Sequence, residues 1–500
     1  MDIFTELFKG FQGLLNVNTI FFCFLGVMLG QVIGALPGIG PSAGTAILLP
    51  VAFSLDPKNA LIMLCGIYYG AMYGGTVTSV LLNIPGESSA VISALEGFKL
   101  AKKGRGGVAL GIAAIGSFIA GTVGVVALTF FAPELAKKAL LFGPAEKFAL
   151  IAMAFAFVSS LTTGSTTKGI VALLIGLILA TVGADVITGV PRLVFGTDWL
   201  ADGFDFVPLA MGFFALAEIM SSMEYTGPVE EISLSELGKV IPTAQDMKRS
   251  WVPIGRGTLI GFICGLMPGA GATIAGFLSY GVEKRYAKHP EEFGDGSLEA
   301  VAATESANNA CAAGHMVPLM SLAIPGTATT AILLSGFMMF GLQPGPSLFT
   351  QHPDVAWGII ASMYMGNVML VIMNIAAIPF FVWVIKKATP FMIPLVIALL
   401  VAGGYSMKNS MNDVWITVGS GVVGYLLVKL KFPLVSILLG VVLGGMAETN
   451  FRQALRISDG SMLVFLQRPI CVTMLVIGLL MLLSPAVMGF MRKGARLKKA

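Results

Sequence analysis

The chain has 500 residues, of which 56% are hydrophobic and only 12% are charged, whereas soluble domains average about 25% charged residues. The net charge of +4 arises from short basic clusters between apolar segments, so it does not indicate a nucleic-acid-binding protein. Residues 106–132, 169–184 and 469–491 contain no Asp, Glu, Lys or Arg. A bilayer core requires about 20 apolar residues per helix, and about twelve such stretches are present. The predicted fold class is an all-α polytopic membrane protein.

The first apolar run, residues 19–36, ends at Pro37 and Gly38, and a second run continues to residue 53. Each run is shorter than a spanning helix. Because Pro removes a backbone donor and Gly tolerates unusual dihedral angles, the sequence predicts a broken or re-entrant helix here. In lipid, an unwound backbone is stable only where protein or an aqueous cavity surrounds it. We therefore expect the break to lie at a buried site, and a merely structural kink is the alternative.

This pattern occurs twice in the chain. The motif G-x3-G-x2-P-G-x-G spans residues 30–40 and returns at residues 261–271, and Asn-Ile-Pro-Gly at residues 83–86 returns as Ala-Ile-Pro-Gly at residues 323–326. An internally duplicated apolar chain with Pro-Gly breaks is typical of a secondary transporter. The predicted organisation is a first membrane half (1–222), a polar linker (223–253) and a second membrane half with C-terminal scaffold spans (254–500).

Corresponding loops of the two halves differ in charge. Four basic residues lie at 99–105, whereas the second-half counterpart at 341–354 has no Lys or Arg. Conversely, residues 283–290 contain three basic residues and their first-half counterpart, residues 54–59, contains one. Because basic loops stay in the cytoplasm, this reversal predicts two inverted repeats. Lys137, Lys138 and Lys147 follow one span after the first basic loop and do not fit this simple scheme.

Two acidic residues next to the motifs are open to two interpretations. Glu87 directly follows the first Ile-Pro-Gly motif, and Glu305 precedes Asn308 and Asn309 in a weakly apolar stretch. Ionisable residues at membrane depth usually serve function. Alternatively, both acids begin helices at the membrane surface.

Several motifs together resemble the TctA family, the large membrane subunit of tripartite tricarboxylate transporters. They include Gly34-x-x-Pro37-Gly38-x-Gly40, Asn83–Gly86, Leu266–Gly271, Ala323–Thr330 and Gly341–Pro346, and the likeness continues to Arg468-Pro469. The resemblance implies a bacterial inner-membrane subunit that works with a small four-span TctB-like subunit and a periplasmic TctC-like solute-binding protein. It implies uptake of carboxylates such as citrate with a sodium or proton gradient and no other cofactor. By analogy with other binding-protein-dependent secondary transporters, it suggests an elevator-like movement.

Carboxylate transport explains why such residues would gather at the breaks. Helix breaks expose backbone N–H groups and positive dipole ends to an anion, and hydroxyl groups add further donors. The substrate-binding candidates are Pro37, Gly38, Gly40, Ser42, Thr45, Pro85, Gly86, Ser88, Ser89, Gly269, Gly271, Thr273, Pro325, Gly326, Thr327, Thr329 and Thr330. Freed carbonyl oxygens together with Asn83, Asn308 or Asn309 would suit sodium, which prefers oxygen ligands.

Two rival functions stay open. One is a stand-alone ion-coupled carboxylate symporter, which would need no binding protein. The other is an intramembrane enzyme, but the three histidines form no H-E-x-x-H motif and no nucleophile–base arrangement is evident. The chain also lacks the phosphate-binding motif of an ATPase. We therefore expect a transporter rather than an enzyme.

Overall fold

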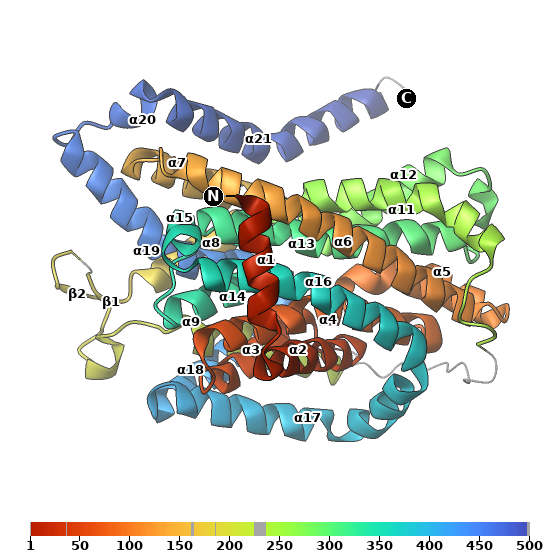
Figure 1. The fold of residues 1–500 in the computed structure, drawn as a ribbon. Helices are drawn as coiled ribbons and strands as arrows, with labels where there is room; N and C mark the ends of the chain where they lie inside the picture. Colours follow the sequence, from red (N-terminus) through yellow and green to blue (C-terminus); the bar gives the residue numbers. More distant parts are fainter. Residues whose placement is uncertain (1, 37, 162–164, 186, 225–236, 498–500) are drawn as a thin grey trace.

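The computed structural model describes residues 2–36, 38–161, 165–185, 187–224 and 237–497 (Figure 1). Within these residues, eight helices are long and apolar enough to cross a membrane, and five shorter apolar helices accompany them. The β-structure of the described residues is one antiparallel pair of two-residue strands. The predicted class of an all-α polytopic membrane protein is confirmed. The count of about twelve spans stays a prediction, because short helices need not cross the bilayer.

The elements of the first half are α1 (Ile3–Leu14), α2 (Val17–Ala35), α3 (Pro41–Ala52), α4 (Pro57–Leu82), η1 (Ser88–Ala90), α5 (Val91–Lys102), α6 (Gly106–Ala139), α7 (Pro144–Leu161), α8 (Thr166–Ala180), β1 (Gly183–Ala184), β2 (Pro191–Arg192), η2 (Asp198–Leu200), α9 (Phe206–Ala210), the π-helix η3 (Met211–Leu216) and α10 (Ala217–Ser222). The second half contains α11 (Ala244–Gly265), α12 (Ala272–Tyr286), η5 (Pro290–Glu292), α13 (Leu298–Leu322), α14 (Ala328–Met339), α15 (Pro346–Gln351), α16 (Pro353–Ala376), α17 (Ile378–Lys408), α18 (Met411–Lys429), α19 (Leu434–Ile457), α20 (Val464–Gln467) and α21 (Pro469–Leu497). Residues 244–253 of the predicted linker therefore belong to α11.

The two central helices, α4 and α13, begin with side-chain caps. The side chain of Asp56 accepts a hydrogen bond from the Asn59 N–H (3.1 Å), and Pro57 occupies the first turn of α4. Ser297 accepts one from the Ala300 N–H (3.2 Å) at the start of α13. Such caps satisfy N–H groups that have no partner within the helix.

Each half contains one pair of helices in very close contact. α2 lies against α4 through three glycines, Gly26, Gly30 and Gly34, where an added Cβ would come within 2.1 to 2.4 Å of a backbone oxygen of α4. α11 lies against α13 in the same way through Gly257, Gly261 and Gly265, with the same 2.1 to 2.4 Å approach. Small residues allow backbones to approach in a membrane. The repeated motifs thus correspond to repeated helix packing.

The long helix α6 connects two ends of the molecule (Figure 1). It begins beside the basic loop at residues 99–105, and its last turns lie next to α15, with Pro133 and Ala136 near Pro346. Its 34 residues span about 50 Å at 1.5 Å per residue. The basic segment 283–290 leads to Asp295, which pairs with Lys103 (2.8 Å), so it lies at the same end as the loop at residues 99–105.

Candidate functional site

Both predicted helix breaks are present. α2 ends at Ala35 and α3 begins at Pro41, whereas α11 ends at Gly265 and α12 begins at Ala272. Gly38 and Gly269 occupy the same place in the two turns, and both have positive φ angles, +80° and +83°. These angles favour glycine over other residues. Pro37 lies outside the described residues.

The second motifs also form matching turns. α4 ends in Asn83 with φ 54°, and α13 ends in Ala323 with φ 57°. In the first half, Gly86 packs so closely on the first break that a Cβ would lie 2.0 Å from the Gly34 oxygen. In the second half, the Gly269 N–H donates to the Gly326 oxygen at 2.9 Å. Within each half, the two turns are therefore in contact.

The turns of one half also contact those of the other. The hydroxyl oxygens of Ser88 and Thr273 lie 2.9 Å apart, which joins η1 to the start of α12. Asn308 Nδ2 of α13 donates to Glu87 Oε1 at 3.2 Å. The structure thus brings sequence-predicted residues from three separate segments into one region.

The predicted substrate-binding residues differ in accessibility. Ser88 is exposed, and seven more are half-buried: Gly38, Ser42, Pro85, Gly269, Gly271, Thr273 and Thr327. The other described candidates are buried: Gly40, Thr45, Gly86, Ser89, Pro325, Gly326, Thr329 and Thr330. Some of the hydroxyl groups form hydrogen bonds within the helices. Thr45 Oγ1 donates to the Pro41 oxygen (2.7 Å), and Thr327 and Thr330 form a reciprocal cap at the start of α14. The accessible candidates therefore lie mainly around Ser88 and Thr273.

The three predicted sodium ligands are not placed as one cluster. Asn83 is exposed at the end of α4, whereas Asn308 and Asn309 are buried within α13. Asn309 Nδ2 donates to Ser117 Oγ (2.7 Å) and to the Glu305 oxygen (3.1 Å), so this amide fastens α13 to α6. Asn308 turns toward Glu87 and the Met72 oxygen.

The structure shows that both acids are buried in the protein. Glu87 is 8% exposed and Glu305 2% exposed, so neither lies at a solvated helix start. Glu87 accepts hydrogen bonds from Ser89 and Asn308, and Glu305 accepts one from Ser93 of α5. Both carboxylates belong to the buried site.

One acidic residue of the site was not predicted. Glu218 of α10 lies beside the first break, where a Cβ on Gly40 would come 3.7 Å from Glu218 Oε1. The sequence signal was available, because Glu218 is a lone acid within the apolar run 206–222, and such acids are usually functional.

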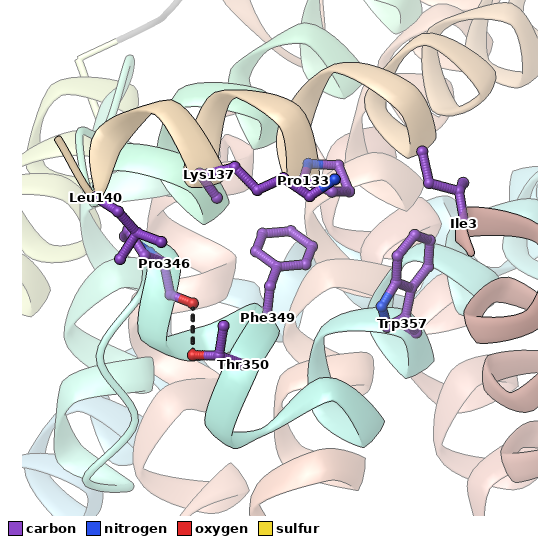
Figure 2. A pocket seen from close by; sticks show the side chains of 9 residues that line it. Ile3, Pro133, Lys137, Leu140, Pro346, Phe349, Thr350 and Trp357 are labelled. Atoms are coloured by element: carbon purple, nitrogen blue, oxygen red, sulfur yellow. Dashed lines mark hydrogen bonds between the residues drawn. The ribbon is translucent and has the colours of Figure 1, made fainter. Parts of the chain in front are cut away.

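Two hollows lie near the α15 end of the molecule. The smaller, about 50 Å³, is lined by apolar side chains of α1, α6, α15 and α16 and by Lys137, with Thr350 bonded to the Pro346 oxygen (Figure 2). The larger, about 410 Å³, reaches Ala323 and Ile324 of the second motif, and Lys147 and Asn450 are among its lining residues. Ligand pockets usually measure about 300 to 1,000 Å³. Only the second of these two could admit a small organic anion.

Comparisons with known proteins identify relatives of the chain. No solved structure matches the chain. It is 42% identical over 479 residues to an "uncharacterized 52.8 kDa protein in TAR-I ttuC' 3'region" of Agrobacterium vitis, covering 96% of this chain and 95% of that protein. It is 40% identical over 219 residues to an "uncharacterized protein in TAR-II ttuC' 3'region" of the same organism, covering 44% of this chain and 90% of that protein. The family model described as "Tripartite tricarboxylate transporter TctA family" matches residues 20–439. The chain therefore belongs to the TctA family of tripartite tricarboxylate transporters.

Proposed function

We propose that this chain is the large transmembrane subunit of a binding-protein-dependent importer of di- and tricarboxylates such as citrate, driven by a sodium or proton gradient. It would lie in the bacterial inner membrane with a TctB-like four-span subunit and a TctC-like periplasmic binding protein. The observation that carries the proposal is the meeting of four helix turns, two from each half, in one region of a TctA-family membrane protein. Unwound turns at membrane depth are where secondary transporters bind their substrates.

The carboxylate would bind beside Ser88 and Thr273. Both hydroxyls are accessible, and Thr273 lies in the first turn of α12, whose N-terminal N–H groups can bind an anion. The N-cap residue Gly271 has no atom within 4 Å of the position that a Cβ would occupy. A carboxylate can therefore approach the backbone there closely.

The 410 Å³ hollow would be the route to this site. Lys147 in its lining would attract an anion, and Ala323 and Ile324 of the second motif in the second half also line it. This assigns a role to a basic residue that does not fit the simple loop-charge scheme. The entrance would then lie at the α15 end, opposite the basic loops, where a periplasmic binding protein would deliver substrate.

The two halves would act as inverted repeats in an elevator-like movement. The contact between Glu87 and Asn308 supports this. The residue 240 positions after Glu87 is Thr327, and the residue 240 positions before Asn308 is Tyr68. These two residues also lie beside each other. Each half thus presents its second turn to the central helix of the other. A pseudo-symmetric pair of this kind can exchange outward- and inward-facing states by repacking.

Uptake of labelled citrate and related carboxylates into proteoliposomes tests the proposal. The full chain would be reconstituted with and without its two partner subunits, under a sodium or a proton gradient. We expect uptake only with a gradient and both partners. Uptake without the binding protein would instead favour the stand-alone symporter, and the absence of uptake for every carboxylate with all partners present would contradict carboxylate transport.

A substitution in a turn gives a second test. A Cβ at Gly326 would lie 2.5 Å from His315 Cδ2, so Gly326→Val should abolish uptake while leaving membrane insertion intact. Gly281→Ala in α12 is the matched control, because nothing lies within 4 Å of a Cβ there. Normal uptake by a correctly inserted Gly326→Val protein would show that the turn geometry is not required.

A further inference from the structure

Glu87, Glu305 and Asn308, from two separate segments, form a buried polar cluster between α4, α13 and the start of α5. Glu87 and Glu305 are both buried, and Asn308 connects to Glu87 through its amide nitrogen (3.2 Å). Glu305 and Asn308 are three residues apart on α13, so they share a helix face. The cluster is composed of oxygen-rich groups from both halves of the chain.

The cluster contains buried oxygen atoms that lack partners. Among the described residues, Glu305 Oε2, Asn308 Oδ1 and the Tyr73 hydroxyl have no hydrogen-bond partner. Glu305, Asn308 and Tyr73 are all at most 2% exposed, and Tyr73 lies close enough to Glu305 to interact electrostatically. A buried polar atom without a partner costs about 1 to 3 kcal/mol. A cation coordinated by several of these oxygen atoms would remove the cost of burying them without partners.

No basic side chain compensates the two carboxylates within the part of the chain that the structure describes. Neither Glu87 nor Glu305 forms an ion pair with Lys or Arg there. The titratable neighbours of Glu87 are Glu305, Glu218, Cys311 and Tyr68. His315 contacts Tyr68 and the Ala270 oxygen rather than a carboxylate. Buried charges are normally paired or bound to a cation.

We propose that Glu87, Glu305 and Asn308 bind a sodium ion, with Tyr73 as a further oxygen donor. The inference rests on the proposed function, because a gradient-driven importer needs a coupling ion. Hard cations prefer carboxylate and carbonyl oxygens over nitrogen or sulfur. The ion would lie between a turn of the first half and the central helix of the second, so its binding would hold the two halves together.

The corresponding region of the other half lacks this chemistry. Positions 240 residues from Glu87, Glu305 and Asn308 are Thr327, Cys65 and Tyr68. These residues are neutral, and Tyr68 is hydrogen-bonded to His315 at 3.0 Å. The proposed site therefore has no equivalent of the same chemistry at these positions of the other half. This asymmetry also supplies a matched control, because Cys65 occupies on α4 the place that Glu305 occupies on α13.

Sodium binding by the purified full chain in lipid nanodiscs tests the site directly. Radioactive sodium would be titrated at constant ionic strength, with potassium as the competing ion. We expect saturable binding by the unmodified chain and a loss of affinity of about tenfold or more in Glu305→Gln and in Asn308→Ala, since even supporting groups change metal affinity by such factors. Cys65→Ala should bind sodium like the unmodified chain.

The outcomes separate the site from the proposed function. Unchanged sodium affinity in folded Glu305→Gln and Glu87→Gln proteins would overturn the site, as would a lack of saturable binding by the unmodified chain. If Glu305→Gln does not fold, Glu305→Asp, which keeps the charge but shortens its reach, should fold and bind more weakly. Sodium binding that depends on the site, in a chain that transports no carboxylate, would support the site and contradict the function. Carboxylate uptake driven by protons alone would support the proposed function and contradict the sodium site.

Discussion

Gly261 and Gly255 lie on the same helix, α11, but face different surroundings. A Cβ at Gly261 would come 2.1 Å from the Ala307 oxygen of α13, whereas nothing lies within 4 Å of a Cβ at Gly255. Gly261→Ala must push the helices apart, and overpacking costs about 1 to 3 kcal/mol. Gly255→Ala should be neutral or stabilising by up to about 1 kcal/mol, because alanine favours a helix. The midpoint of thermal aggregation of the detergent-solubilised proteins would measure both, and equal midpoints would contradict the close packing.

Glu96 of α5 illustrates a buried carboxylate with a structural role. It is 0% exposed and accepts hydrogen bonds from the N–H groups of Gly294 (2.6 Å), Gly296 (2.9 Å) and Ser297 (2.9 Å) and from the Tyr280 hydroxyl (2.7 Å). It therefore holds the segment that begins α13 against α5. Its negative charge also suits the positive end of α13.

Glu96→Ala should lower the thermal stability of the protein strongly, because each buried donor left without a partner costs about 1 to 3 kcal/mol. The control is Glu134→Ala, which removes an exposed ion pair with Lys137 (2.5 Å) on the surface of α6. Exposed pairs contribute little, so this variant should unfold at the same temperature as the unmodified chain. A small effect of Glu96→Ala would mean that the segment before α13 is held by other contacts.

At the scale of elements, the contact between η1 and α12 joins the two halves. Because the Ser88 and Thr273 hydroxyl oxygens lie 2.9 Å apart, cysteines at both positions should form a disulfide on oxidation. If the turns must separate during transport, the oxidised double variant should lose uptake and regain it after reduction. Gel mobility after proteolysis between the two positions would report the crosslink.

The two single variants serve as controls for this experiment. Ser88→Cys or Thr273→Cys alone should show no oxidation-dependent loss of uptake, since the native cysteines of the described residues are buried. A crosslinked double variant with full uptake would show that these elements move as one unit.

The helix breaks could be predicted from the sequence because their causes are local. Pro removes a donor and Gly permits positive φ, so Gly38 and Gly269 mark the turns whatever surrounds them. The burial of Glu87 could not be predicted, because a neighbouring Pro-Gly motif does not show which helices cover the turn. The pairing of Ser88 with Thr273 depends on tertiary packing over 185 residues. Glu218 was missed because its helix carries no repeated motif.

At the scale of the whole molecule, the charged loops lie at one end of helix α6. Lys99 donates to the Gly294 oxygen and Lys103 pairs with Asp295, so the basic loops of both halves meet at one end. The segment 341–354, which contains α15 and follows the second motif in the second half, lies at the opposite end of α6 (Figure 1). The loop after the same motif in the first half is the basic one. Corresponding loops at opposite ends are what an inverted repeat requires.

Cysteine accessibility in intact cells can test this topology. Lys102, Lys284 and Gln351 are exposed, so cysteines introduced there can react with a membrane-impermeant maleimide. Because basic loops stay in the cytoplasm, Lys102→Cys and Lys284→Cys should react only after the inner membrane is permeabilised. Gln351→Cys should react from the periplasm without permeabilisation. Reaction of all three from the same side would refute the inversion, and with it the placement of the carboxylate entrance opposite the basic loops.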